Sequence, residues 1–144
     1  MYMQKGKTHT SQRRKKMKKI EKFEELIRRC DEGENLKFTD FPEVNPTLYW
    51  AYRHSKRNGL RTIDFNDVVW GKDAQAIVKT LREEGYKSFT VSSTFSGLLE
   101  IVEAFGKEGC KMGGLTRVKQ GFTEFDEETG KIVDAERPAL RIRL

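Results

Sequence analysis

The sequence is poor in the residues that build metal centres and disulfide-linked folds. Its 144 residues include two cysteines and two histidines, and Cys30 and Cys110 stand far apart. This spacing matches neither a zinc ligand set nor a redox Cys-x-x-Cys pair, so we expect two free thiols in a reducing compartment. Because His9 and His54 are isolated from other ligands, no zinc site is predicted. No cofactor is expected.

Long apolar runs are also missing. None approaches the roughly 18 residues of a membrane span, and the basic N-terminus is not followed by the apolar stretch of a secretory signal. We therefore expect a cytoplasmic protein with no membrane partner. Hydrophobic residues make up 36% and charged residues 35% of the chain, which is polar for a globular protein. The length still allows one buried core.

Acidic residues are absent from the first 19 positions, which hold eight basic residues. The whole chain has 28 basic and 22 acidic residues, so residues 20–144 are left with 20 basic and 22 acidic. The net charge of +6 therefore belongs to the leading segment. On this basis we divide the chain into a basic arm and N-terminal helix, residues 1–33, and an α/β body, residues 34–144.

The leading segment combines a predicted disordered stretch with a predicted helix. Residues 1–12 are polar and show no period. Apolar residues then recur every three or four positions from Met17 to Cys30, which predicts a helix from about Ser11 that Gly33 ends. Cations on its first turns oppose the helix dipole, which favours a role outside helix stability. A solubility tail would explain residues 1–12 equally well, and a solvated helix end would explain the basic cluster: Arg13, Arg14, Lys15, Lys16, Lys18 and Lys19.

A second helix is predicted from Thr47 to Asn58, with Asn45 as its cap and Pro46 at its first position. Aromatic and basic residues are interleaved along it. Such a helix can stack on bases and contact phosphates, which makes Arg53, Lys56 and Arg57 candidate nucleic-acid ligands. The structural alternative is that Tyr49, Trp50 and Tyr52 pack the helix onto a sheet, while the cations favour its C-terminal dipole.

The rest of the chain alternates between strand and helix patterns. Two strands (Arg61–Phe65 and 88–92) are each predicted to be followed by a helix, the second of which starts at Ser93-Thr94. Asp73 is expected to cap the first of these helices, and Val68, Val69 and Trp70 are expected to face the core.

Two further strands complete the expected fold. One runs from Cys110 to about Phe122 with a bulge at Gly113-Gly114, and the other runs from Ala139 to Leu144 after Pro138 at its entry. A hairpin turn at 126–130 joins them. The order β-α-β-α-β-β predicts a mixed four-stranded sheet packed by helices, with the first three strands parallel. This is an α/β fold on the border of α+β, preceded by the basic N-terminal helix.

The turn after the strand at 88–92 is a candidate anion site. Ligands of open α/β sheets bind at the carboxyl ends of strands, and the hydroxyls of Ser92, Ser93 and Thr94 stand there beside a predicted helix start. Capping of the helix explains at least one of these residues equally well. A glycine-rich phosphate loop with a lysine is missing, which argues against a nucleotide site.

Catalytic patterns are weaker. The stretch around Ser96 lacks the flanking glycines of a nucleophile elbow. A metal-dependent nuclease would need converging carboxylates, for which Asp64, Asp67 and Glu100 are candidates. Asp64 and Asp67 fit a strand edge and a turn equally well.

From about residue 46 to 144 the chain resembles a family of small uncharacterised proteins from phages and mobile elements of Gram-positive gut bacteria. The matching stretches are Phe65-Asn66-Asp67-Val68-Val69-Trp70, Phe89 to Glu100 with its Ser-Ser-Thr-Phe-Ser-Gly run, Gly114-Leu115-Thr116-Arg117-Val118, and Pro138-Ala139-Leu140-Arg141-Ile142. The resemblance implies a genomic setting and no activity, and the basic arm lies outside it. By analogy, small accessory proteins of such elements often counter host defence, including CRISPR nucleases, or assist DNA transfer.

These observations lead to the expectation of a non-enzymatic binding protein of a mobile element. Its partner would be nucleic acid or a host ribonucleoprotein, reached through the basic arm, and its role would be inhibition of host defence of the anti-CRISPR type. The alternatives are protein–protein recognition through the folded body and a metal-dependent nuclease.

Overall fold

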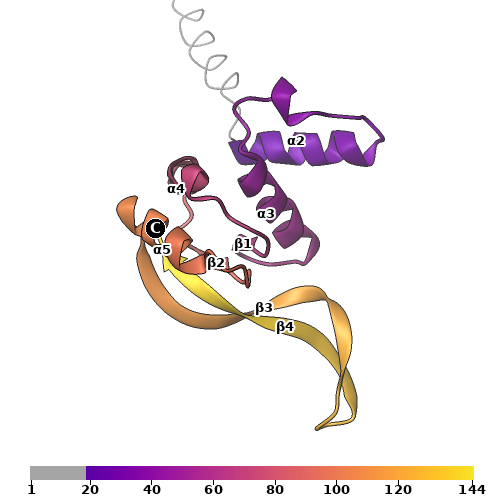
Figure 1. The fold of residues 1–144 in the computed structure, drawn as a ribbon. Coiled ribbons are helices and arrows are strands. Elements are labelled where there is room, and N and C mark those ends of the chain that lie inside the picture. The colour runs from indigo at the N-terminus through magenta and orange to yellow at the C-terminus, as the bar shows by residue number, and fades with distance from the viewer. Residues whose placement is uncertain (1–18) are drawn as a thin grey trace, which may run out of the picture. The chain divides into compact units, whose positions relative to one another are not determined.

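A computed structural model describes residues 19–144 (Figure 1). The chain forms two compact units that divide between Val44 and Asn45, whereas the sequence-based division lay at residue 33. Residues 1–18 lie outside the description. With them lie the predicted disorder of residues 1–12 and the first turns of the helix expected from Ser11.

The first unit contains the helix α2, Lys19–Asp31, and the short 3-10 helix η1, Phe38–Asp40. The apolar spacing along α2 is confirmed, since Phe23 and Leu26 are buried. Gly33 ends the helix with a φ of 93°, and its N–H donates to the carbonyl of Cys30. Two cations make cation–π contacts with the Phe41 ring. Lys22 Nζ lies 5.2 Å and the Arg29 guanidinium 5.6 Å from the ring centroid.

The second unit is built on the predicted mixed sheet. Its strands lie in the order β1-β2-β4-β3, with β1 parallel to β2 and β4 antiparallel to both of its neighbours. Since β4 runs against both, β3 has the direction of β2, and the three strands that follow helices are parallel as expected. The elements are α3 (Pro46–Arg57), β1 (Asp64–Phe65), η2 (Gly71–Asp73), α4 (Ala74–Glu83), β2 (Ser88–Val91), α5 (Leu98–Lys107), β3 (Lys111–Asp126) and β4 (Lys131–Arg143).

The core of this unit lies between the sheet and its helices. Phe65 of β1, Phe89 of β2 and Phe105 of α5 stack edge to face, with ring centroids 5.5 and 4.8 Å apart. Leu48 of α3 and Leu81 of α4 are completely buried. Burial of apolar area of this kind is the main force that holds the helices on the sheet.

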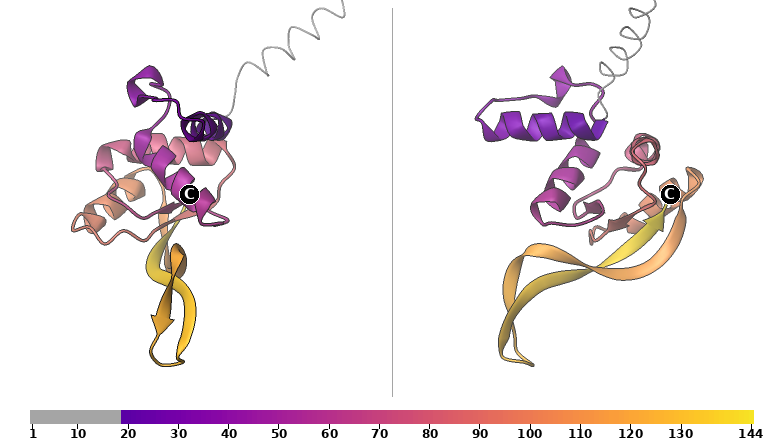
Figure 2. Two further views of the ribbon diagram at one scale, coloured as in Figure 1. Left: turned by 90° about the vertical axis from the view of Figure 1, so that its right-hand side faces the viewer. Right: turned by 180° about the vertical axis from the view of Figure 1, so that it is seen from behind.

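Strands β3 and β4 continue beyond the sheet as a long two-stranded hairpin (Figures 1 and 2). In β4, β2 pairs only with residues 140–143, so the β2-facing edge of β4 is open from residue 131 to residue 139. The predicted start of the last strand at Ala139 is therefore wrong, since β4 begins at Lys131. Pro138 is tolerated inside the strand because no β2 carbonyl requires its missing N–H. The alternation of apolar residues appears only where β4 faces the core.

Two glycine positions bend this hairpin. The predicted bulge at Gly113-Gly114 is confirmed by a register shift between Met112 and Gly114. A second shift lies between Lys119 and Thr123 and includes Gly121, which has a φ of 85°. A Cβ at Gly121 would overlap the Asn58 side chain at the end of α3, and the positive φ strains any other residue there, so the position favours glycine.

The start of α5 differs from the prediction. The helix begins at Leu98 and not at Ser93-Thr94, because Ser92 and Ser93 are buried at the end of β2 and a turn follows them. Its cap residue is Gly97, which has no side chain to cap the helix. The serines and threonine of this stretch therefore terminate the strand and do not start the helix.

Two expectations on the connection between β1 and α4 are also corrected. Val69 is buried, but Val68 is 36% and Trp70 60% exposed, since consecutive residues of an extended chain point to alternate sides. Asp73 precedes α4 as expected, yet its carboxylate accepts hydrogen bonds from Asn45 Nδ2 at 3.2 Å and Thr47 Oγ1 at 3.1 Å. It thus fastens α4 to the start of α3.

Candidate nucleic-acid interface

The helix α3 separates its aromatic residues into two groups. Its cap is confirmed, since Asn45 Oδ1 accepts from the Leu48 N–H at 3.0 Å. Tyr49 and Tyr52 are buried and fit the structural alternative, whereas Trp50 is 53% exposed. The guanidinium of Arg53 lies 5.4 Å from the Trp50 ring centroid, within range of a cation–π contact. Lys56 and Arg57 follow on the exposed last turn of the helix.

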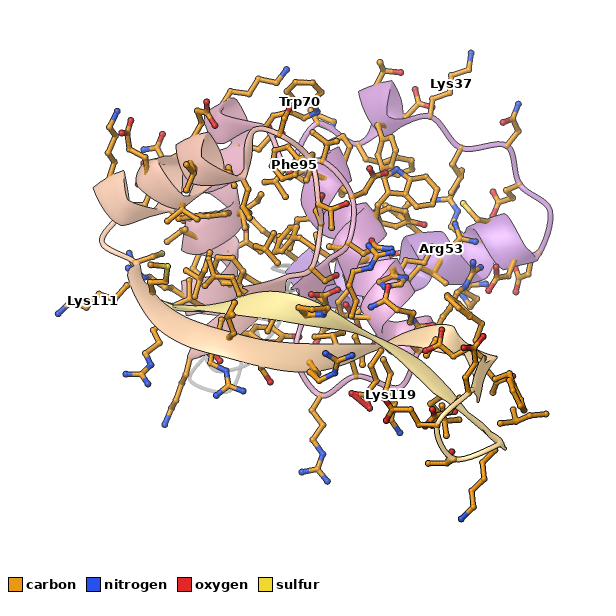
Figure 3. All side chains as sticks on the ribbon, turned by 60° about the horizontal axis from the view of Figure 1, so that its bottom comes forward. Lys37, Arg53, Trp70, Phe95, Lys111 and Lys119 are labelled. Atoms are coloured by element: carbon orange, nitrogen blue, oxygen red, sulfur yellow. The ribbon has the colours of Figure 1, made fainter. Side chains whose placement is uncertain are left out.

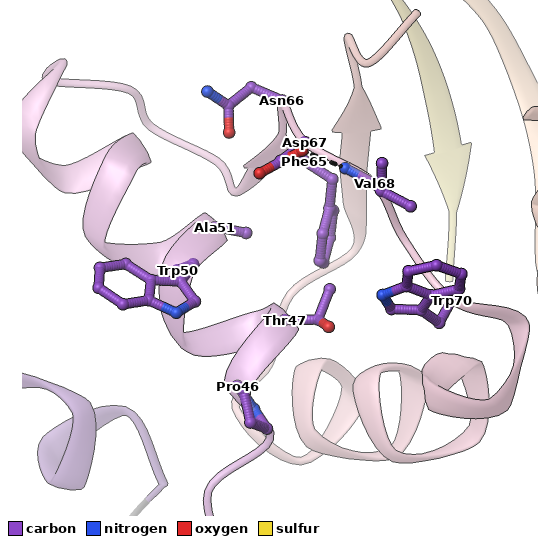
Figure 4. Close-up of a pocket in the computed structure, with 9 residues that line it drawn as sticks. All are labelled: Pro46, Thr47, Trp50, Ala51, Phe65, Asn66, Asp67, Val68 and Trp70. Carbon is purple, nitrogen blue, oxygen red and sulfur yellow. Dashed lines mark hydrogen bonds between the residues drawn. The ribbon is translucent and has the colours of Figure 1, made fainter. Parts of the chain in front are cut away.

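A pocket of about 350 Å³ opens beside Trp50, at the carboxyl end of β1 (Figure 4). Trp50 comes from α3, Trp70 comes from the segment before η2, and the two indoles stand on either side of the Phe65 ring. The Asp67 carboxylate accepts from the Val68 N–H at 2.7 Å, which holds it beside Val68. The lining residues are Pro46, Thr47, Trp50, Ala51, Phe65, Asn66, Asp67, Val68 and Trp70.

His54 stands on α3 among amide groups. Asn58 Nδ2 lies 3.2 Å from its Nε2, and Asn66 Nδ2 lies 3.4 Å from its Nδ1. A neutral imidazole has one acceptor nitrogen, which can accept from an amide N–H, and a second ring proton would remove this acceptor. Burial lowers the pKa of His54 below 6.5; the Asp64 carboxylate raises it and Arg137 lowers it further.

The predicted anion residues meet a buried carboxyl group. Asp64 at the start of β1 is completely buried, Ser92 Oγ donates to its Oδ2 at 2.6 Å, and Thr90 Oγ1 donates to its Oδ1 at 2.7 Å. Ser93 is buried and Thr94 exposed, and the N-terminus of α5 lies further along the chain. This geometry gives no support to an anion site at Ser92, because the Ser92 hydroxyl already donates its hydrogen bond to Asp64.

The candidate nuclease carboxylates do not share one environment. Asp64 is internal, whereas Asp67 and Glu100 are exposed. Among residues 19–144, no group of three His, Cys, Asp or Glu side chains is placed to hold a metal ion. Both cysteines are free thiols, and burial raises the pKa of Cys110.

A cationic depression of about 550 Å³ lies at the start of β2, where β2 meets the end of α4 and the end of β4. Arg141 and Arg143 point to the exposed face of β4, and Lys111, whose strand position pairs with Arg143, extends into solvent nearby (Figure 3). No Asp or Glu side chain lines it. Its four cations, Arg82, Lys87, Arg141 and Arg143, are exposed and form no ion pair within the described chain.

Sequence reasoning did not select these four residues. The signal was present for two of them, because Arg141 and Arg143 alternate with Leu140, Ile142 and Leu144 and so had to share one face. Arg82 and Lys87 join them only through the fold, which brings the end of α4 and the start of β2 beside the end of β4.

The predicted cations of the leading segment lie mostly outside the described residues: Arg13, Arg14, Lys15, Lys16 and Lys18. Lys19 is described, as the first residue of α2. Beyond it, the cations of α2 are neutralised within their own unit. Arg28 bonds both carboxylate oxygens of Glu32, and Arg29 bonds both of Glu34, whose pKa this bonding lowers.

The hydroxyl bonds to Asp64 make a testable contribution to stability. We expect Asp64→Ala to lower the free energy of unfolding by about 3 kcal/mol, because it leaves two buried hydroxyls without an acceptor. Asp64→Asn should cost less, since an amide still offers one oxygen and one donor. Urea unfolding measures both, with exposed Glu103→Ala as a control expected to change stability by under about 0.5 kcal/mol. Equal losses for Asn and Ala would contradict this account.

His54 predicts a pH dependence. Its pKa is lowered in the folded state, so below pH 6.5 the unfolded chain takes up a proton that the folded chain refuses. Stability should therefore fall as the pH drops through and below 6.5, and it should be regained above it. His54→Gln should flatten the slope of unfolding free energy between pH 7 and 5.5. An unchanged slope in this variant would assign the effect to other groups.

The comparisons with known proteins identify a family and no activity. No curated protein and no solved structure matches the chain. Within residues 19–144, none of the helices is both long and apolar enough to span a bilayer. Residues 47–144 match a domain of unknown function, DUF7698, and hold the cationic depression and all of the tryptophan pocket except Pro46. The chain therefore belongs to the DUF7698 family.

Proposed function

We propose that the protein is a non-enzymatic nucleic-acid-binding protein of a phage or other mobile element. It acts in the host cytoplasm on nucleic acid or on a nucleic-acid-bound host complex, as an inhibitor of host defence of the anti-CRISPR type. The mobile-element setting rests on the sequence resemblance given above, and the binding rests on charge and geometry.

The observation that carries the proposal is the cationic depression. Four exposed cations surround one hollow, and none of its lining side chains is a carboxylate. Cations that line one hollow repel one another, and an anionic partner would offset this repulsion. A polyanion such as a nucleic-acid backbone can contact several of them at once and release its counterions.

The basic arm adds a second cationic element of different character. Its eight cations precede the family domain, whereas the depression lies inside that domain. The cations that follow the arm in α2, Lys22, Arg28 and Arg29, are each paired with a carboxylate. The excess positive charge of the first unit is therefore concentrated in residues 1–19, where it increases the rate and strength of polyanion binding.

Two variants test binding to a fluorescent single-stranded oligonucleotide by anisotropy over a range of salt concentrations. Replacing the six cations from Arg13 to Lys19 by Gln should abolish most binding. Arg141→Gln/Arg143→Gln should weaken binding and reduce the slope of log affinity against log salt by about 2. The matched control is Arg117→Gln/Lys119→Gln, which removes the same charge from residues paired with Glu136 and Asp134.

The salt series also separates this proposal from its rivals. Equal affinity of all variants at low salt would overturn nucleic-acid binding through these cations. Incubation of the labelled DNA or RNA with magnesium or manganese tests the nuclease alternative in the same samples, and cleavage would replace the non-enzymatic proposal.

A second candidate function is protein recognition through the folded body, and the tip of the β3–β4 hairpin favours it. The hairpin tip, residues 122–133, exposes Phe122, Phe125 and Ile132 by 59–75%. It also carries four acidic residues against one lysine. Exposed apolar patches rimmed by charge are typical of protein interfaces. The acidic rim would repel nucleic acid and fits a protein surface with an apolar centre and cationic edge.

Deletion of residues 1–19 distinguishes the two candidates. If the hairpin tip recognises a protein, pull-downs from host lysate should retain the same proteins after this deletion. Phe122→Ser/Phe125→Ser should then lose them, while Leu99→Ser, a control on an exposed apolar residue of α5, should keep them. Loss of the proteins on deletion of the arm alone would contradict recognition by the tip.

A further inference from the structure

Both tryptophans of the chain line the same pocket. Trp50 is 53% and Trp70 60% exposed, although burial of a tryptophan contributes more than that of almost any other side chain. They come from different elements, α3 and the segment before η2, and they stand on either side of the buried Phe65 ring (Figure 4). The fold thus brings two wetted indoles together across a hollow of about 350 Å³.

The pocket matches a flat and polar-edged ligand. Its volume lies at the lower end of the range for small-molecule sites, and its walls are aromatic and aliphatic. Polar groups are few: the Asn66 amide, the Asp67 carboxylate and the Thr47 hydroxyl, which donates to Asp73. The Asp67 carboxylate repels phosphate, so any phosphate group of the ligand would have to remain outside the pocket.

Resting on the proposed function, we propose that this pocket binds one unstacked base of a single-stranded nucleic acid. The base stacks on an indole face, as bases do on the aromatic platforms of single-strand-binding proteins. The Arg53 guanidinium at the Trp50 ring lies on the same helix as Lys56 and Arg57, and these cations are suited to the phosphates on either side of the base.

A cationic ligand, such as an arginine side chain of a partner protein, is the competing occupant of an aromatic pocket with a carboxylate. The contact between Arg53 and Trp50 disfavours it, because a cation already uses that indole and would repel a second one. A neutral base does not meet this repulsion.

Asp67 gives the pocket a preference among bases. One of its oxygens accepts from the Val68 N–H, and the remaining acceptor positions of the carboxylate are suited to N–H donors on the edge of a base. Guanine presents two adjacent donors, N1–H and the 2-amino group, whereas thymine presents one. Guanine is therefore the favoured base.

Intrinsic tryptophan fluorescence reports on this pocket alone, since the chain has no other tryptophan. The full chain is titrated with an oligothymidine dodecamer, with the same dodecamer carrying one central guanine, and with an abasic dodecamer of equal charge. Quenching should saturate with both base-containing strands, at lower concentration for the guanine strand. The abasic strand should bind by anisotropy without quenching.

Three variants sharpen the test. Trp70→Ala should weaken binding of the guanine strand about tenfold and leave the affinity for the abasic strand unchanged. Asp67→Asn should remove the preference for guanine over thymine. Leu99→Ala, which truncates an exposed apolar residue of α5, should change neither. Circular dichroism verifies that each variant is folded.

The failures are distinguishable. Strands that bind by anisotropy yet leave tryptophan emission unchanged would overturn the base pocket while nucleic-acid binding stands. Absence of binding by either readout would overturn both. Quenching by an arginine-rich peptide, with none by any oligonucleotide, would assign the pocket to a cationic protein segment.

Discussion

The pairing of β1 with β2 depends on one buried carboxyl group. Asp64 lies inside the protein and accepts hydroxyl bonds from Thr90 and Ser92 of the neighbouring strand, while its own N–H donates to Ser55 Oγ of α3 at 2.8 Å. β1 has only two residues, so ladder bonds alone hold it weakly. The side-chain bonds join α3, β1 and the end of β2, and both walls of the tryptophan pocket extend from these elements.

Much of the fold could be predicted from the sequence because helix and strand periods report on burial. The order of elements, the parallel strands, the Asn45 cap and the bulge at Gly114 all follow from local rules. The predictions failed where local signals have two uses. Ser92 and Ser93 resemble a helix cap but end a strand, and Asp73 bonds to α3 while it precedes α4.

The candidate site was less accessible to sequence reasoning, because its residues meet only in three dimensions. Trp50 was selected for its helix, but Trp70 was assigned to the core, and nothing local indicates that the two share a pocket. Arg82 and Lys87 likewise become candidate ligands of an anion only because the fold places them beside Arg141 and Arg143. Alternation along β4 indicated which face the arginines share, whereas contacts between distant segments depend on packing that no short pattern encodes.

The close approach of Gly121 to Asn58 has a mechanical consequence for the hairpin. At one end of the hairpin, residues 140–143 of β4 are hydrogen-bonded to β2, and further along Gly121 lies against Asn58 at the end of α3. Beyond that point the two strands have only each other as partners. A partner that displaced the outer hairpin would therefore disturb the contact between Gly121 and Asn58, and through it the end of α3, the helix that carries Trp50.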